Sequence, residues 1–337
     1  DAAPPMNPST MTALPRIAYT IGDPSGIGPE LATRVLSDPG NLAKAVVHLL
    51  ASRAEVEHWS AELGVTVPVG DEPGPGHVVL VHTPHADEEV PRGTMSVAGG
   101  TRVLTDLLHA LGMYKSGTVD AILFESLNKT ALHLAGMHEQ DELRWFAKEL
   151  EYDGFTSELN FVPGLTTSRV TSHIGIKEVA ENINARATRD AITLLNEAIK
   201  RNGVAEPRLA VCALNPHAGE NGQFGCEEID HIAPGIELAQ KSGVSVEGPF
   251  PSDTIFIKAR NGIYDGVVTM YHDQGQIAMK LMGFDQGVTV QGGLPVPICT
   301  PAHGTAYEIV GKGVAKVGPS QRAFNIACNL GLSSQGH

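Results

Sequence analysis

The chain is poor in several features that mark other classes of protein. Its 337 residues include only four cysteines, none in a CxxC spacing, so we expect free thiols in a reducing compartment. No run of 18 apolar residues occurs, which excludes a transmembrane helix. Basic residues are also scarce: 24 Lys and Arg against 38 Asp and Glu give a net charge of −14, which disfavours nucleic acid or an anionic membrane as a partner. Aromatic residues make up only 5%, but a hydrophobic content of 42% is typical of an α/β enzyme.

The first fifteen residues are rich in Pro, Ala, Ser and Thr and lack the basic and apolar regions of a signal peptide. We interpret residues 1–15 as a disordered or expression-derived arm. Without a leader, a membrane span or disulfides, the expected location is the cytoplasm.

Strand-like and helix-like segments alternate along the rest of the chain. Apolar runs predict strands at residues 16–21, 45–50, 77–82, 120–124, 168–171, 208–214 and 266–271. Helical periodicity predicts helices at residues 29–36, 54–63, 98–111, 142–150 and 188–200. This alternation predicts a mostly parallel sheet in α/β/α layers, and the length favours two lobes.

Three histidines occupy the same kind of position. His173, His217 and His272 each lie just past a predicted strand, beside Gly, Asn, Asp or Gln. The carboxyl ends of strands in an open α/β sheet face the ligand crevice, so three imidazoles there can converge on one divalent ion. Most of the 14 His are expected to be surface or core residues, but three together favour a metal site. The expected metal is Zn, Co, Ni, Mn or Mg.

Two glycine-rich segments are candidates for ligand binding. Residues 22–30 (GDPSGIGPE) do not match the dinucleotide motif GxGxxG, and we expect them to shape a cleft with Asp23 near the substrate or metal. Residues 303–313 (HGTAYEIVGKG) suit a backbone wrapped around a flat ligand, and Glu308 can accept hydrogen bonds from a ribose diol. A plain loop-to-helix connection is the alternative for the second segment.

Two lysines lie close to the predicted strand ends. Lys129 follows the strand ending at residue 124, and Lys280 lies eight residues after His272. Either can bind an anion or act as an acid or base beside a metal. The alternative for both is a solvated charge on a helix surface.

Taken together, these segments resemble the PdxA family, the 4-hydroxythreonine-4-phosphate dehydrogenases of vitamin B6 synthesis. The resemblance spans roughly residues 16–332 and rests on a combination of motifs: GDPxGIGPE, LNPHAGExGxFGxEE (214–228), GPxPxDTxF (248–256), MYHDQG (270–275) and HGTA. It implies two α/β/α domains similar to those of isopropylmalate dehydrogenase, with a cleft between them. We assign residues 16–135 plus 281–337 to the first domain, with the HGTA loop, and residues 136–280 to the second, with the metal histidines.

The resemblance also implies an activity and its residues. It implies a homodimer with a metal-binding active site at the subunit interface, where NAD, bound without a Rossmann fold, accepts hydride from a secondary alcohol and the product loses CO2. The family's metal histidines fall on His173, His217 and His272. The catalytic positions are expected at Lys280, Asp253 and Asp273. The cofactor contacts are expected at His303, Gly304, Thr305, Ala306, Glu308 and Asn215.

At several positions where the family is expected to bind substrate, this chain has different residues. Asp23 and Lys129 remain, but other substrate-binding positions have changed: Asp141, Glu142, Leu143 and Arg144 replace GHTE, Thr289 replaces Asn, Ile298 replaces Arg, and residues 125–129 (ESLNK) replace TGPxNK. Each lost charge-assisted contact to phosphate costs ~1.5–3 kcal/mol, and Glu142 adds repulsion to a dianion. We therefore expect an unphosphorylated small carboxylate, held by Arg144 against apolar walls of Leu143, Trp145 and Ile298. The alternative for this segment is a helix whose Trp145 faces the core.

The leading hypothesis is an NAD-dependent, metal-dependent, decarboxylating dehydrogenase of a hydroxy acid or cis-dihydrodiol carboxylate. Terephthalate cis-dihydrodiol dehydrogenases are such relatives, which implies a role in terephthalate degradation and aromatic catabolism. The alternative enzyme is a dehydrogenase whose substrate is 4-hydroxythreonine-4-phosphate, or a threonate or erythronate phosphorylated at position 4. A non-catalytic ligand-binding protein of the same fold is the second alternative.

Overall fold

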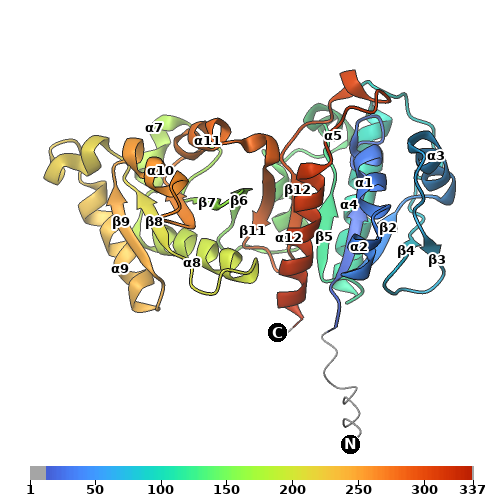
Figure 1. Cartoon of the computed structure of the whole chain (residues 1–337). Helices are drawn as coiled ribbons and strands as arrows, with labels where there is room; N and C mark the ends of the chain where they lie inside the picture. The colour runs from blue at the N-terminus through green and yellow to red at the C-terminus, as the bar shows by residue number, and fades with distance from the viewer. Residues whose placement is uncertain (1–12, 336–337) are drawn as a thin grey trace, which may run out of the picture.

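The computed structural model describes residues 13–335, so the arm predicted for residues 1–15 falls almost wholly outside the described residues. Within that range twelve strands form one continuous sheet, in the order β3-β4-β2-β1-β5-β12-β11-β6-β7-β10-β8-β9 (Figure 1). The strands are β1 (Arg16–Thr20), β2 (Val46–Leu50), β3 (Val69–Gly70), β4 (Val78–Leu80), β5 (Ala121–Phe124), β6 (Ser157–Val162), β7 (Leu165–Arg169), β8 (Leu209–Cys212), β9 (Val246–Phe250), β10 (Gly266–Thr269), β11 (Val288–Gly292) and β12 (Ile298–Pro301). The α-helices are α1 (Gly28–Leu36), α2 (Pro39–Ala43), α3 (Arg53–Leu63), α4 (Val97–Lys115), α5 (Lys129–Ala135), α6 (Glu142–Glu149), α7 (Ile176–Val179), α8 (Ala185–Arg201), α9 (Ala233–Lys241), α10 (Ser252–Arg260), α11 (His272–Leu281) and α12 (Gly318–Ser334).

Two parallel halves of the sheet are joined by antiparallel strands. The strands from β3 to β12 in the sheet order pair in parallel, and so do β7, β10, β8 and β9. Between them, β11 and β6 pair antiparallel with their neighbours. The predicted mostly parallel α/β sheet is confirmed, whereas the division into two domains stays a prediction.

Alternation along the strands divides the side chains between two helical layers. On β1, Ile17 and Tyr19 join the core cluster of α1 and α12, while Ala18 joins that of α4 on the other face. In the second half, α8 and α9 continue the first layer, and α10 and α11 pack on the opposite face. Figure 1 shows α1, α2 and α12 in front of the sheet and α4 behind it.

Two further expectations can be compared with the fold. All four cysteines are free, and three of them are buried in the core: Cys212, Cys299 and Cys328. None of the helices in residues 13–335 is long and apolar enough to cross a membrane.

Candidate active site

A cavity of about 310 Å³ lies where residues following β5, β7, β10 and β12 meet. Side chains of β6 and β11 complete its wall. Eight of the predicted site residues line it: Lys129, Glu142, His173, His272, Lys280, Thr289, His303 and Gly304. These residues come from distant parts of the sequence, so the fold brings them together.

Two of the predicted metal histidines are neighbours in this cavity. The ring centroids of His173 and His272 are 5.5 Å apart. The Nδ1 atom of His173 lies 2.6 Å from Oδ2 of Asp141, and Nδ1 of His272 lies 2.6 Å from Oδ1 of Asp273. A carboxylate that holds one ring nitrogen fixes the tautomer and leaves Nε2 as a metal ligand, which is the usual arrangement around metal-binding histidines. The donor chemistry of this pair therefore fits a divalent ion.

Asp141 joins this pair to the start of α6. Its Oδ1 atom accepts a hydrogen bond of 2.8 Å from the backbone N–H of Arg144, which caps the helix. Burial alone would raise the pKa of Asp141, but the hydrogen bonds from His173 and Arg144 hold it below its ordinary value. The carboxylate stays ionised and can orient the imidazole.

His217 lies elsewhere, although it also follows a strand as predicted. It begins a stretch in which residues 217–221 all have positive φ, a left-handed turn that costs roughly 1–2 kcal/mol for each residue other than glycine. The turn is tied down by Asn215, whose Nδ2 atom donates to Oε1 of Glu228 at 2.8 Å. Within the described residues, no three His, Cys, Asp or Glu side chains form a group that could hold a metal. One copy of the chain therefore brings together two of the three predicted ligands.

The two glycine-rich segments pack against each other. The backbone N–H of Ile27 donates to the carbonyl of Thr305 at 3.0 Å, and a Cβ on Gly26 would lie 2.8 Å from that same carbonyl oxygen. Asp23 is 1% exposed. Its carboxylate accepts two hydrogen bonds, from the backbone N–H of Ser25 and from the hydroxyl of Tyr307 at 2.5 Å. Asp23 thus connects the two loops and is not among the residues that line the cavity of His173.

A second cavity of about 80 Å³ lies beside these loops. Its wall includes Ile27, Trp59, Arg92 and Gly311. Trp59 offers an aromatic face, and Arg92 is held by an ion pair of 2.8 Å to Glu62.

The remaining predicted residues lie outside the main cavity. Ile298 is fully buried in a core cluster with Trp145. Arg144 is exposed, contacts Gln140 and lines a neighbouring cavity of about 370 Å³. Four others are at least partly exposed. Asn215 lies in the loop of His217, and Asp253 lies at the start of α10. Ala306 and Glu308 lie in the glycine-rich segment 303–313, which borders the second cavity.

Sequence reasoning missed several polar residues of the cavity wall. They are Glu158 and Asn160 on β6, Gln276 on α11 and Gln291 on β11. Three of the amides have buried atoms without a hydrogen-bond partner in the described structure: Asn160 Nδ2, Gln276 Oε1 and Gln291 Oε1. A buried polar side chain without a partner is rare in a folded protein and indicates a ligand contact. The signal in the sequence was weak, because Glu158, Asn160 and Gln291 interrupt the apolar pattern that predicts strands, and Gln276 is an ordinary residue for a helix.

A cavity at strand ends, with paired imidazoles, lysines and packed glycine-rich loops, is typical of an α/β enzyme. Comparisons with known proteins identify the class as dehydrogenase. A family model described as "Pyridoxal phosphate biosynthetic protein PdxA" matches residues 32–327, and the chain belongs to this family.

Relatives and solved structures agree with that assignment. "Putative 4-hydroxythreonine-4-phosphate dehydrogenase 2" of Pseudomonas aeruginosa is 47% identical over 95% of this chain and 98% of its own. "D-threonate 4-phosphate dehydrogenase" of Pectobacterium atrosepticum is 34% identical over 94% and 99%. The solved 4-hydroxythreonine-4-phosphate dehydrogenase of Klebsiella pneumoniae matches with a TM-score of 0.78 and 32% identity over 95% and 98% of the two chains. A terephthalate 1,2-cis-dihydrodiol dehydrogenase of Burkholderia xenovorans matches with a TM-score of 0.72 and 26% identity over 94% and 98%.

The predicted family and the dehydrogenase class are confirmed, but the expected terephthalate-type substrate is wrong. The relatives at 47% and 34% identity are named for phosphorylated acids, and nothing supports terephthalate degradation or aromatic catabolism. The structure gives the physical reason. Arg144 and Ile298, on which the expectation depended, do not line the cavity, whereas Lys129, Lys280 and His303 do. Replacement of individual phosphate-binding residues therefore leaves other groups that can bind an anion.

Proposed function

We propose that this chain is an NAD-dependent dehydrogenase of a four-carbon hydroxy acid that carries a phosphate ester on its last carbon. 4-Hydroxythreonine 4-phosphate and D-threonate 4-phosphate, after which its relatives are named, are the two candidates. The observation that carries the proposal is the shared cavity, which unites the His173 and His272 pair with Lys129 and Lys280. A pair of metal-ligating groups with Lys280 suits the carboxylate and hydroxyl end of such a molecule, and Lys129 suits its phosphate.

The residues of the chain can then be given roles. Asp141 and Asp273 orient the two imidazoles, and a bound divalent ion would act as a Lewis acid toward the substrate hydroxyl and carboxylate. Lys280 can take the hydroxyl proton as hydride leaves for NAD. Oxidation next to the carboxylate-bearing carbon gives a 3-oxo acid, whose carboxylate can leave as CO2 because the ketone accepts the electron pair. Asp253 is assigned a catalytic role only by its motif.

The paired loops are the proposed NAD site. Gly26 lets the first loop pack directly on Thr305 of the second, and the cavity between them, beside Trp59, suits the adenine ring of the cofactor. At His303, burial lowers the pKa, so the ring is neutral near pH 7. Its Nδ1 atom lies 2.9 Å from the carbonyl of Gly304 and donates to it, which leaves Nε2 as an acceptor for a cofactor hydroxyl or amide.

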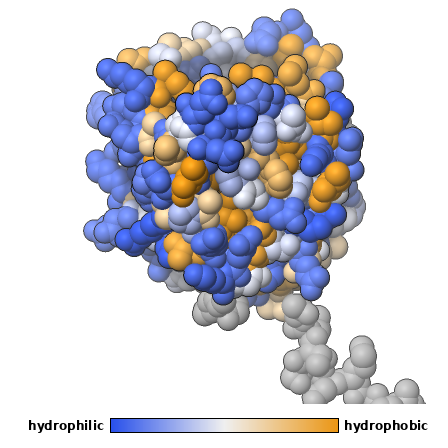
Figure 2. Space-filling model, turned by 90° about the vertical axis from the view of Figure 1, so that its left-hand side faces the viewer, coloured by the Kyte–Doolittle hydropathy of each residue, from blue (hydrophilic) through white to orange (hydrophobic). Residues whose placement is uncertain are grey.

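We further propose that the enzyme works as a homodimer in which the partner subunit's His217 completes the metal site. His217 is exposed in an outer loop, with its ring centroid 6.4 Å from that of Phe224, and Phe224 and Ile229 of this region are 47% and 55% exposed. Near the cavity, Ile277 and Leu281 of α11 are 62% and 85% exposed. In a twofold dimer these two apolar regions can cover each other and bring His217 to the other copy's cavity. Figure 2, which faces the left-hand end of Figure 1, shows apolar patches among hydrophilic residues on this end of the molecule.

The test of the activity is NADH formation with the two phosphorylated acids and their unphosphorylated counterparts, with and without divalent metal. We expect metal-dependent turnover, slower by about 100-fold without the phosphate, because one or two charge-assisted contacts are lost. Faster oxidation of the unphosphorylated acids would contradict the proposal.

The dimer has its own test, which is subunit complementation. The variants His173→Ala and His217→Ala should each be inactive alone. If His217 acts on the other subunit, mixed dimers contain one intact site, and refolding the two together should restore about a quarter of wild-type activity. A mixture that stays inactive would show that His217 does not act across an interface.

A further inference from the structure

The second cavity, beside Trp59, has its own arrangement of charges. Its wall carries two carboxylates, Glu30 on α1 and Glu62 on α3, and one guanidinium, that of Arg92. Glu62 lies three residues after Trp59, so the two side chains project from the same face of α3. Any adenine nucleotide bound in this cavity must therefore fit these charges.

Glu30 offers an acceptor to such a nucleotide. Its Oε1 atom accepts a hydrogen bond from Nη2 of Arg34 at 3.2 Å, and Arg34 does not line the cavity. Its Oε2 atom is buried and has no hydrogen-bond partner in the described structure, which indicates a donor supplied by a ligand. The hydroxyls of a ribose and the amino group of adenine are donors without charge. The wall therefore fits an adenosine.

Glu62 holds Arg92 in place beside the cavity. Nη2 of Arg92 donates to Oε1 of Glu62 at 2.8 Å, and this hydrogen bond is the main reason why the pKa of Glu62 lies below its ordinary value. The other oxygen of Glu62 lies 3.3 Å from Nε2 of His58. A Cβ on Gly311 would lie 3.4 Å from Nη2 of Arg92, so the pair rests against this glycine. Among the described residues that line the cavity, the one cation is thus already neutralised by a carboxylate.

NAD and NADP differ only at the 2′-oxygen of the adenosine ribose, which carries a hydroxyl in NAD and a phosphate in NADP. A hydroxyl can donate to the carboxylates of the wall and brings no charge with it. A 2′-phosphate would be attracted by Arg92, but the carboxylate of Glu62 beside it would repel the phosphate and offset the attraction. Such discrimination depends on a group that repels the competitor, and not on a better contact to the favoured ligand.

We propose that Glu62 selects NAD over NADP by neutralising Arg92, which without Glu62 would bind the 2′-phosphate. This role of Glu62 rests on the proposed NAD site and adds the pair of residues that determines cofactor choice there. It is separate from the role expected for Glu308, which does not line this cavity. Glu62 acts on cofactor specificity and touches no reacting atom.

The experiment measures the dissociation constants of NAD and NADP by quenching of tryptophan fluorescence, without substrate. Trp59 lines the cavity, whereas the only other tryptophan, Trp145, is buried in the core. We expect the wild type to bind NAD at least about tenfold more tightly than NADP. Glu62→Gln should strengthen NADP binding by about 10–100-fold, because one charge-assisted contact to phosphate becomes available, and should change NAD binding by less than about threefold.

Two further variants separate this explanation from a general change of charge. Glu57→Gln removes the same charge from an exposed position of α3 that does not line the cavity, and should keep the wild-type ratio. In the double variant Glu62→Gln with Arg92→Gln the gain in NADP binding should disappear, because the cation that holds the phosphate is gone. A gain that persists there would assign the phosphate to another cation, such as the exposed Lys312, and would overturn the proposal.

Turnover provides a separate readout. If no acid is oxidised but NADP binding responds to Glu62 and Arg92 as expected, the role of Glu62 stands and the proposed reaction does not. If NADH forms but Glu62→Gln binds NADP no better than the wild type, the reaction stands and the role of Glu62 is wrong. A wild type that binds NADP as tightly as NAD, or binds neither, would also overturn it.

The variants should fold, which thermal unfolding checks. The side chains of Arg92 and Glu62 are 52% and 31% exposed, and ion pairs at such positions contribute little to stability. If Glu62→Gln is nevertheless unfolded, Glu62→Ser removes the same charge and should give the same gain in NADP binding.

Discussion

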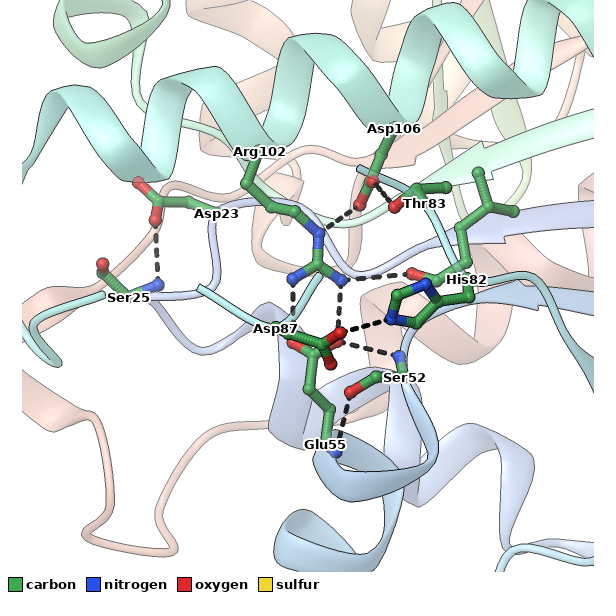
Figure 3. Close-up of polar contacts among 10 residues, drawn as sticks. Asp23, Ser25, Ser52, Glu55, His82, Thr83, Asp87, Arg102 and Asp106 are labelled. Carbon is green, nitrogen blue, oxygen red and sulfur yellow. Dashed lines mark hydrogen bonds and ion pairs between the residues drawn. The ribbon is translucent and has the colours of Figure 1, made fainter. Parts of the chain in front are cut away.

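Two buried arginines of this molecule lie in opposite kinds of surroundings. Arg102 on α4 is 2% exposed and every arm of its guanidinium is bonded: Nε to Asp106 at 2.9 Å, Nη1 to Glu55 at 2.8 Å, and Nη2 to Glu55 at 2.9 Å and the Leu50 carbonyl at 3.4 Å (Figure 3). Arg169 on β7 is 3% exposed, donates from Nη1 to Ser172 at 2.7 Å, and has a single ion pair, from Nη2 to Oε2 of Glu158 at 3.4 Å, which lacks the geometry of a hydrogen bond.

Their ionisation follows from these surroundings. Burial tends to lower the pKa of both groups, but Glu55 and Asp106 more than offset burial at Arg102 and raise its pKa, whereas burial prevails at Arg169 and lowers it. A closed polar network around Arg102 holds α3, α4 and the end of β2 in place. The network around Arg169 has fewer bonds and lies between two cavities: Glu158 lines the main one, and Arg169 lines the neighbouring one.

The largest expected effect is the loss of activity when a histidine of the main cavity is replaced. His173→Ala and His272→Ala should each lower kcat/KM by at least about 1000-fold and abolish stoichiometric metal binding, with the melting temperature nearly unchanged. The measurements are activity, metal content and thermal unfolding. The control is His58→Ala, an exposed histidine on α3 that should behave as the wild type. Metal content that stays stoichiometric in both variants would show that these residues are not ligands.

Changes in the closed network around Arg102 should affect stability and not activity. Arg102→Met leaves Asp106 and Glu55 without their cation in a buried place, and we expect the free energy of unfolding to fall by about 3–5 kcal/mol. Arg169→Met should cost less, because it removes one ion pair of 3.4 Å and the carboxylate left behind, Glu158, lines the cavity and can be solvated. Chemical denaturation of both variants checks the contrast. Equal losses would contradict the contrast, because they would mean that the single ion pair of Arg169 stabilises the fold as much as the full set of bonds around Arg102.

A buried acid in the first half of the sheet predicts a pH dependence of stability. Glu125 is fully buried and accepts hydrogen bonds from Tyr19 at 2.6 Å and Ser320 at 2.8 Å. Burial raises its pKa from 4.5 to about 7, although the two hydroxyls oppose the shift. Between these values the folded state keeps a proton that the unfolded chain has released, so stability falls as pH rises through this window.

Glu125→Gln should remove this dependence, because a neutral amide needs no proton. At pH 8 we expect the variant to be more stable than the wild type by about 3 kcal/mol at most, and at pH 5 the two should differ little. Thermal melts across this range make the comparison. A wild-type stability that rises between pH 5 and pH 7, with no difference between the two proteins, would contradict the assignment.

The smallest expected effect concerns the loops. Glu308 is exposed, and its carboxylate should repel the 2′-phosphate of NADP, so we expect NAD to be preferred. Glu308→Ser should reduce the preference by about tenfold, since a single exposed charge is screened by solvent. Steady-state kinetics with both cofactors measures the ratio, and equal efficiency of NAD and NADP in the wild type would count against the role of Glu308.

Local sequence determined much of this protein. Apolar runs correctly predicted the strands β1, β2, β4, β5, β7, β8 and β10, and helical periodicity the helices α1, α3, α4, α6 and α8, to within a few residues. These elements bury continuous or periodic apolar faces. The same pattern placed His173, His217 and His272 after strands. The strands β6 and β11 were missed, because Glu158, Asn160 and Gln291 face the cavity and break the apolar pattern.

Only the tertiary structure decided which residues meet. A sequence motif marks a residue as the end of a strand, but its neighbours depend on the order of strands in the sheet and on the path of each loop. His173 and His272 meet because β7 and β10 are adjacent, whereas the left-handed turn after residue 216 carries His217 away although β8 is adjacent to β10 as well. For the same reason Ile298 lies in the core and Glu142 in the cavity, since side-chain direction on a strand or a first helical turn is set by packing against elements far away in the sequence.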